Sequence, residues 1–162
     1  HSGTEFERMG GMAKPFAVLC STWNGLPLIY SGQELPNQKR LKFFDKDQID
    51  WTGEYSLHGF FRTLLQLRKR NPALRSGDPA VTLHRLHNGL DDRCFAFARR
   101  NGDNQVVVLL NLSAGELSLP VSQLLLQGNY REAFTGNYLN LSALGNLTLP
   151  AWGYAVYEKI SG

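Results

Sequence analysis

The chain has 162 residues, of which 43% are apolar and 19% are charged. These proportions are typical of a globular protein and exclude a disordered or membrane-embedded class. The net charge of +3 is too small to indicate a nucleic-acid partner. Cys20 and Cys94 lack metal-binding spacing, so we expect free, buried side chains, with a disulfide between them as the alternative.

Residues 4–21 predict a helix, because apolar side chains recur there at helical spacing. Ser2 or Thr4 can cap its first turn. The pair Gly10-Gly11 is expected to weaken or kink the middle of this helix.

An apolar run follows at residues 26–31, between Gly25 and Gly32. A short apolar run between turn signals indicates a strand buried on both faces, as in parallel sheets. Polar Gln33 and Glu34 come directly after it, followed by a long loop and a helical pattern. A strand that ends in polar groups and leads into a helix is the repeating unit of a βα barrel, whose active site lies at those strand ends. Gln33 and Glu34 are therefore candidate substrate-binding residues.

The loop up to residue 55 contains three neighbouring acids, Asp45, Asp47 and Asp50. Acids at alternate positions could hold calcium, but this spacing lacks the glycine and terminal glutamate of an EF-hand loop. A glycosidase carboxylate pair is a second interpretation, and it needs two carboxyls held about 5–10 Å apart across a sugar. Because the acids share one flexible loop with Lys46, we expect them to be solvated or to cap local turns instead.

Residues 56–70 predict a helix with one wide apolar stripe and charged residues outside it. Ser56 is the expected cap, and Asn71-Pro72 is the expected stop. The cluster Arg68-Lys69-Arg70 lies where a helix dipole favours cations. We therefore interpret the cluster as a helix end rather than a phosphate-binding patch.

From residue 80 the sequence changes to short β-rich runs separated by turn residues such as Asn101-Gly102. Many short strands with such punctuation indicate an antiparallel sandwich or barrel, which we expect to fold independently of the preceding residues. The alternation in residues 94–99 fits a strand buried on one face only. Strands are expected at residues 80–86, 94–99, 105–112, 116–119, 130–134, 147–149 and 152–159.

Several segments carry a family resemblance. The chain has the pattern G-x-P-x-I-Y-x-G-x-E at Gly25, Pro27, Ile29, Tyr30, Gly32 and Glu34. This pattern resembles the segment on the eighth barrel strand of the α-amylase family, glycoside hydrolase family 13. The KRLKFFDKDQIDW segment resembles the loop after that strand. The resemblance extends over most of the chain through the segments GTEFERMG, LRKRNPALRSG and LPAWGYAVYEK.

The resemblance implies a chain in two parts. Residues 1–76 would be the C-terminal segment of a catalytic (β/α)8 TIM barrel, with the last strand at about 26–31 and the last helix at about 56–70. Residues 77–162 would be an all-β C-terminal domain, an antiparallel β-sandwich. Tyr30 would join Gln33 and Glu34 at the barrel mouth as substrate-contacting groups. The other interpretation of these three residues is barrel packing and loop anchoring.

The same resemblance implies an enzyme whose catalytic residues lie outside this chain. α-Amylases hydrolyse α-glucans with retention, using an Asp and a Glu on earlier barrel strands. A further Asp lies in an Asn-His-Asp motif after strand seven, but His1 is followed by Ser2 rather than Asp. We therefore expect no catalytic residue, metal site or cofactor in this chain, and no hydrolysis of α-1,4-glucan by the chain alone.

A parent enzyme would act on starch or maltooligosaccharides and could carry calcium. The remaining N-terminal barrel portion would be the partner of this chain, and no nucleic acid or membrane partner is implied. The resemblance favours a secreted or periplasmic location. A second function class is a non-catalytic carbohydrate-binding or structural β-sandwich module, in which Trp152 and Tyr154 would stack on sugar rings. Since Trp152, Tyr154 and Tyr157 fall in a predicted strand, we expect them to pack inward instead.

Overall fold

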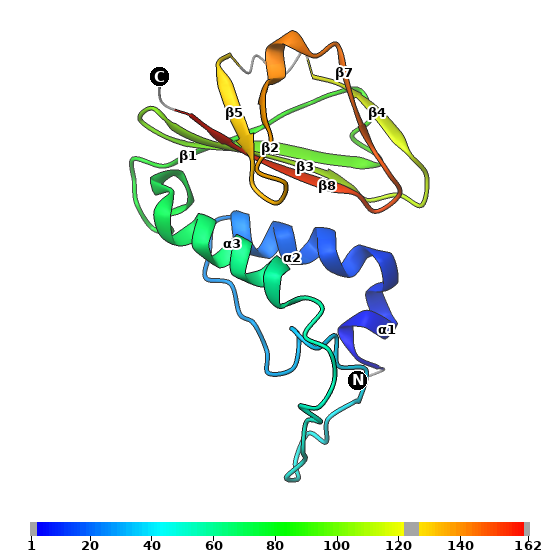
Figure 1. Cartoon of the computed structure of the whole chain (residues 1–162). Helices are drawn as coiled ribbons and strands as arrows, with labels where there is room; N and C mark the ends of the chain where they lie inside the picture. The colour runs from blue at the N-terminus through cyan, green and yellow to red at the C-terminus, as the bar shows by residue number, and fades with distance from the viewer. Residues whose placement is uncertain (1–2, 122–126, 161–162) are drawn as a thin grey trace.

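The computed structural model describes residues 3–121 and 127–160. Helices α1 (Glu5–Met9), α2 (Ala13–Thr22) and α3 (His58–Arg70) precede the strands. Figure 1 shows three layers, in which α2 and α3 lie beneath a large sheet and a two-stranded sheet lies above it. His1 and Ser2 lie outside the described residues, so their predicted roles are left open.

The first helix confirms the capping and the break expected from the sequence. Thr4 caps α1 through a reciprocal pair of bonds, in which Glu7 N donates to Thr4 Oγ1 at 3.3 Å and Thr4 N donates to Glu7 Oε2 at 2.6 Å. Gly10 then takes a φ of 51°, a conformation that glycine adopts readily, and α1 ends. A short 3-10 turn (Gly10–Met12) leads into α2.

Position 11 in this break requires a glycine, because the indole ring of Trp152 occupies the space where a Cβ atom would lie. A Cβ atom at Gly11 would lie 2.3 Å from Cδ1 of Trp152. Trp152 lies in the turn before the last strand, with a φ of 55° that is rare for a residue with a side chain. The contact therefore joins the start of α2 to the far end of the sequence.

We expect Gly11→Ala to destabilise the protein by about 1–3 kcal/mol, because overpacking displaces side chains and backbone. Gly59→Ala is a matched control, since a Cβ at Gly59 meets nothing within 4 Å. Alanine is the better helix former by up to about 1 kcal/mol, so this control is expected to be neutral or stabilising. Urea denaturation measures both variants. A Gly11→Ala protein as stable as the unsubstituted chain would contradict the ring contact.

Helix α3 begins at His58 and has no side-chain cap, so the prediction that Ser56 caps it is wrong. Its apolar stripe is confirmed in part. Leu57, Phe61, Leu64 and Leu67 are buried, whereas Leu65 is 43% exposed. The helix ends at Asn71 as expected, where the side-chain oxygen accepts from Ala73 N at 3.0 Å.

Residues 26–31 do not form the predicted strand. Residues 26–30 are outside the helices and strands of the structure, and Leu26 and Leu28 are 89% and 81% exposed. A strand requires a hydrogen-bonded neighbour, and no strand of the described chain lies beside this segment. The apolar pattern is therefore present without the pairing that would make it a buried strand.

The large sheet has six strands, in the order β1-β2-β3-β8-β5-β6, and its neighbouring strands are antiparallel. Its strands are β1 (Thr82–Arg85), β2 (Cys94–Asn101), β3 (Asn104–Asn111), β5 (Asn129–Glu132), β6 (Tyr138–Asn140) and β8 (Tyr154–Lys159). The second sheet pairs β4 (Leu117–Pro120) with β7 (Asn146–Leu149). Each strand expected from the sequence overlaps one of these, and β6 was not expected.

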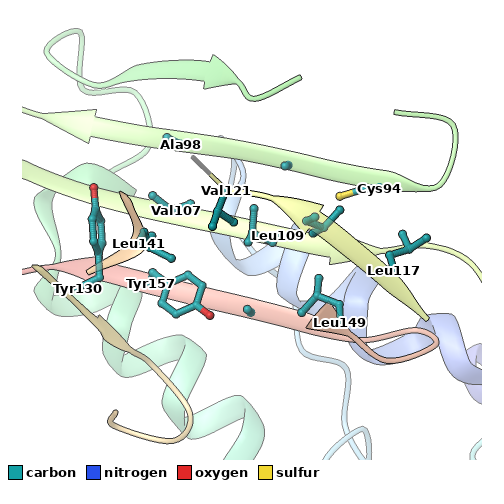
Figure 2. Packing of buried hydrophobic residues seen from close by; sticks show 13 residues of the cluster. Cys94, Ala98, Val107, Leu109, Leu117, Val121, Tyr130, Leu141, Leu149 and Tyr157 are labelled. Carbon is teal, nitrogen blue, oxygen red and sulfur yellow. The ribbon is translucent and has the colours of Figure 1, made fainter. Parts of the chain in front are cut away.

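The central strands of the large sheet, β2, β3 and β8, are buried on both faces, which corrects the prediction of one-sided burial for residues 94–99. One face packs against the small sheet (Figure 2). Its cluster comprises Cys94, Ala96, Ala98, Val107, Leu109, Leu117, Leu119, Val121, Tyr130, Leu141, Leu149, Ala155 and Tyr157. The other face packs against α2, α3 and a 3-10 turn (Pro72–Leu74). That cluster comprises Val18, Leu64, Leu67, Ala73, Leu74, Phe97, Val106, Val108, Leu110 and Val156. The helices therefore complete the core of the sheet.

Arg99 on β2 joins the C-terminal end of α2 to the large sheet through hydrogen bonds. The residue is 1% exposed. Its guanidinium donates to the carbonyl oxygens of Trp23 at 3.0 Å and Arg75 at 2.8 Å, and over longer distances to those of Thr22 at 3.3 Å and Leu74 at 3.4 Å. A cation is favoured here because the last carbonyls of a helix lack backbone partners and carry its negative dipole end.

Arg68 on α3 binds the neighbouring part of the same segment. Its guanidinium donates to the carbonyl oxygen of Ser21 at 3.0 Å, to Ser76 Oγ at 2.6 Å and to the carbonyl oxygen of Gly25. Burial lowers the pKa of Arg68. Part of the predicted basic cluster thus has a local structural role, in agreement with its interpretation as a helix end.

Both cysteines are free, so the alternative of a disulfide is wrong. Cys94 is buried, as expected, and its sulfur accepts from Asn88 Nδ2 at 3.2 Å. Burial raises the pKa of the Cys94 thiol. Cys20 is exposed, which corrects the expectation of burial.

Candidate functional site

Tyr30 and Gln33 are tied to each other and to the first helix. The side chain of Gln33 accepts from Tyr30 N at 2.8 Å, and Gln33 N donates to the carbonyl oxygen of Tyr30 at 3.1 Å. Gln33 Nε2 donates to Glu5 Oε2. The two residues therefore form one turn anchored on α1, with the Tyr30 side chain 61% exposed.

Glu34 has a different place from the other two candidates. Its carbonyl oxygen accepts from Leu57 N at 3.1 Å, directly before α3. No hydrogen bond of its carboxylate to another described residue is formed. Glu34 thus joins the turn to the start of α3 through its backbone, in keeping with loop anchoring.

A cavity of about 630 Å³ lies next to the turn and is lined by three stretches of chain, residues 3–6, 30–33 and 37–45. Tyr30 and Gln33 line it, whereas Glu34 does not. The opposite wall is the loop of residues 37–45, which supplies Arg40, Phe43 and Phe44. The volume is within the range of small-molecule sites. Sequence reasoning missed this wall, because a loop without periodicity gives no signal of where it folds back.

Asp47 holds that loop in shape. Its carboxylate accepts from Lys39 Nζ at 2.5 Å, Gln48 N at 2.8 Å and Lys42 N at 3.0 Å. Asp50 accepts from Thr52 N at 2.9 Å in a second local turn. These bonds confirm for Asp47 and Asp50 the expectation that the loop acids cap local turns.

We expect the loop to lose this order in acid. The hydrogen bond from Lys39, then those from the Lys42 and Gln48 amides, lower the pKa of Asp47 from 3.8 to about 2. Because the folded pKa lies below the unfolded one, the contribution to loop order is complete above about pH 4 and is lost as the pH falls through about 2. Amide NMR shifts of Lys42 and Gln48 measure the midpoint. The Asp47→Asn protein should lack the transition, and a midpoint near 4 would contradict the prediction.

The calcium interpretation of the loop acids gains no support from the structure. Among residues 3–121 and 127–160, no group of three or more His, Cys, Asp or Glu side chains is arranged to hold a metal ion. In the same residues, no helix has the length and apolar character needed to cross a bilayer.

The three aromatic residues near the C-terminus are packed, as expected. Tyr154 contacts Phe60 and Phe134, with ring centroids 5.6 Å and 5.1 Å away. Tyr157 is 3% exposed within the sheet core. Trp152 precedes β8 and lies against Gly11. Tyr154 and Trp152 therefore do not form an open surface on which a sugar could stack.

Comparisons of this chain with a family model, with known sequences and with solved structures each match amylases. Residues 86–156 match the family model described as the maltogenic amylase C-terminal domain. Alpha-amylase 2 of Dictyoglomus thermophilum is 28% identical over 138 residues, which cover 77% of this chain and 22% of that protein. The maltogenic alpha-amylase of Bacillus acidopullulyticus is 28% identical over 127 residues, which cover 74% of this chain and 20% of that protein. The chain thus spans about a fifth of the length of these relatives.

A solved structure shows a related arrangement of the whole chain. The α-amylase from Anoxybacillus superposes with a TM-score of 0.74 at 18% identity, over 93% of this chain and 33% of that one. At this identity the likeness concerns the fold alone. It includes the helices as well as the sheets, since the matched part is nearly the entire chain.

Proposed function

This chain is the C-terminal portion of an α-amylase family protein of glycoside hydrolase family 13, and we propose that it completes the catalytic barrel of an α-glucan hydrolase. Residues 1–76 supply the last strand and last helix of the barrel, and residues 77–162 form the domain that follows. The catalytic carboxylates of the retaining mechanism lie in the preceding part of the parent protein. That part is the partner of this chain.

One observation carries the proposal, namely the unpaired apolar segment at residues 26–30. Leu26, Leu28 and Tyr30 are 89%, 81% and 61% exposed, whereas Pro27 and Ile29 between them are half-buried. This alternation has the period of a strand. An apolar segment whose backbone groups lack strand partners, as at residues 26–29, is a template for strand pairing, since each polar group buried without a partner costs about 1–3 kcal/mol.

The side of this segment that faces the helices already has apolar neighbours. Pro27, Leu28 and Ile29 line an apolar hollow of about 110 Å³ together with Phe16 and Phe61 of the helices. In a βα barrel, helices pack on the outer face of the strands and strand neighbours close the ring. Neighbouring strands from the preceding barrel portion would cover Leu26 and Leu28.

The cavity beside Tyr30 and Gln33 supports a place for them at the barrel mouth. In this proposal both residues contact the α-glucan, and Glu34 positions their turn by its backbone bond to Leu57. Starch and maltooligosaccharides are the proposed substrates. A calcium ion in the parent and a secreted or periplasmic location follow from the family alone, and both belong to the proposal.

The proposal is tested by amide exchange and by hydrolysis. We expect the 162-residue chain to release no reducing ends from soluble starch, and the amides of Leu28 and Ile29 to exchange rapidly. The same amides should be protected in a protein that joins this sequence to the preceding barrel portion, and that protein should hydrolyse starch.

A strand-blocking variant makes this test specific. Leu28→Asp should reduce hydrolysis by the joined protein, because the charge would be buried on strand pairing. Leu83→Asp is the control, since Leu83 is 37% exposed on the edge strand β1. Hydrolysis by the chain alone, or protected amides at Leu28 and Ile29 in it, would refute the proposal.

A further inference from the structure

The sequence contains three Asn-x-Ser/Thr sequons, at Asn111, Asn140 and Asn146, and the proposed role in completing the barrel uses none of them. A sequon is the pattern in which an enzyme can link a sugar to the asparagine amide, and the modified residue lies at the surface. Two of the three have the same four residues, Asn-Leu-Ser-Ala, at 111–114 and 140–143. A difference between these two therefore comes from the fold and not from the local sequence.

Both Asn-Leu-Ser-Ala segments form the same local turn. Asn111 Oδ1 accepts from Ser113 N at 3.0 Å and from Ser113 Oγ at 2.7 Å. Asn140 Oδ1 accepts from Ser142 N at 3.1 Å and from Ser142 Oγ at 2.6 Å. Two donors on Oδ1 stabilise the negative charge that gathers there when Nδ2 gives up a proton. The turn therefore favours reaction of the amide nitrogen at both positions.

The fold closes off the amide of Asn111. The residue is 0% exposed at the end of β3. Its Nδ2 donates to the carbonyl oxygens of Gly115 and Pro150, each at 2.7 Å, and over a longer distance to that of Leu149 at 3.4 Å. This nitrogen joins the turn after β3 to the end of β7, so a sugar on it would break buried hydrogen bonds and would have no space.

The amide of Asn140 is open. Asn140 and Ser142 are both exposed, and Asn140 Nδ2 donates no hydrogen bond to another described residue. Tyr138, two residues earlier on β6, shares its face of the strand and is 70% exposed, so an enzyme can approach this face. In Figure 1, β5, the partner of β6, lies on the opposite side of α2 and α3 from the segment after α2, where the preceding barrel portion is proposed to join. A sugar on Asn140 would leave that junction free.

Asn146 is exposed too, but its sequon lies in a strand. Residues 146–149 form β7 and pair along their whole length with β4. The Asn146 side chain makes no hydrogen bond to another described residue, so it lacks the turn that Asn140 forms. An enzyme would have to draw this segment out of its ladder, whereas residues 141–143 already form a 3-10 turn outside the strands. Asn140 is therefore the best placed of the three acceptors.

We propose that Asn140 is an acceptor for N-linked glycosylation of the folded protein, and that Asn111 is not. The donor is a nucleoside-diphosphate sugar. Asn140 Nδ2 forms a bond to C1 of the sugar, the bond from C1 to the diphosphate oxygen breaks, and the diphosphate leaves with its electron pair while Nδ2 loses one proton. This modification goes beyond the role of the chain in completing the barrel and does not depend on it.

Transfer of glucose from UDP-glucose to the folded 162-residue chain tests the site. The enzyme used is a soluble N-glycosyltransferase that modifies both free peptides, residues 109–115 and residues 138–144, so that the local sequence does not limit the reaction. We expect the folded chain to gain one hexose on Asn140 and none on Asn111. Intact mass gives the number of hexoses, and peptide mapping gives their positions.

Two variants identify the acceptor. Ser142→Ala removes the hydroxyl that the sequon requires and should abolish the transfer. Thr148→Ala makes the matched change in the sequon of Asn146 and should leave the transfer unchanged. Circular dichroism checks that both variants are folded. A folded chain that gains no hexose would overturn the proposal, as would unchanged transfer to Ser142→Ala or transfer to Asn111 or Asn146 in place of Asn140. The barrel role is read separately, from amide exchange and starch hydrolysis.

Discussion

Replacing Arg99 by methionine is expected to lower the free energy of unfolding by about 3–5 kcal/mol, the range found when one partner of a buried charged interaction is removed. The guanidinium is the common donor to four carbonyl oxygens from two separate segments, residues 22–23 and 74–75. Methionine fills much of the same space but donates no hydrogen bond. The carbonyls would then be left in a buried place without their partner.

Burial disfavours the charged form of Arg99, and the pKa of its guanidinium reflects this cost. Burial, and then the charge of Arg68, lower the pKa of the Arg99 guanidinium. Its Nε has no hydrogen-bond partner among the described residues. The carbonyl oxygens at the end of α2 offset this cost, since they combine hydrogen bonding with the negative end of a helix dipole.

Two variants control for the loss of a side chain and of a charge. Arg100→Met makes the same substitution at the next residue, which is exposed and whose side chain, among the described residues, bonds only to Gly102 O at 2.9 Å; it should change stability by about 0.5 kcal/mol or less. Arg99→Lys keeps the charge but cannot fork between the two segments, so an intermediate loss is expected. Urea denaturation measures all three. An Arg99→Met protein as stable as Arg100→Met would show that the bonds to α2 contribute nothing.

A chain that begins at residue 77 is expected not to fold. Without the helices, one face of the large sheet would be open to water. That face includes Phe97, Val106, Val108, Leu110 and Val156, each with 0% exposure in the whole chain. Full burial of one such side chain stabilises by about 1.5–3 kcal/mol, so exposing all five costs about as much as the whole stability of a typical domain.

This expectation replaces the independent folding that the sequence suggested for residues 80 onward. Near-ultraviolet circular dichroism and binding of a hydrophobic dye compare the truncated chain with the whole one. We expect lost tertiary signal and strong dye binding. A truncated chain that unfolds cooperatively as a monomer would contradict the prediction and would support the independent domain.

The difference between the two expectations shows what the sequence can and cannot tell. Turn residues and alternation located every strand except β6, whose three residues Tyr138–Asn140 are too few for a period to appear. Alternation in Phe95, Phe97 and Arg99 identified a face but not what covers it. Arg99 in particular is a residue type normally exposed, and only the distant carbonyls of residues 22–23 and 74–75 explain its burial.

The sequence singled out one side of the candidate site but not the opposite wall. The run at residues 26–31 and the polar residues after it singled out Tyr30 and Gln33, which line one cavity, and their contact with a substrate stays a prediction. Glu34 adjoins them in sequence but not in the cavity, because the chain turns at Gly32, which has a φ of 91°. The opposite wall comes from a loop whose shape depends on the bonds of Asp47, and these follow no periodic pattern.

The order of strands in the large sheet bears on how the protein is made. The strand β8 lies between β3 and β5, although every other strand precedes it along the chain. A ribosome delivers residues at about 5–20 per second, so the helices and edge strands emerge before the piece that joins them. Until Tyr154–Lys159 arrives, the β5–β6 hairpin has no partner in the sheet and Val108 lacks its neighbour Val156. A nascent chain that ends before this strand would therefore expose apolar surface of β3 and of the β5–β6 hairpin, which the rest of the sheet covers only once β8 is in place.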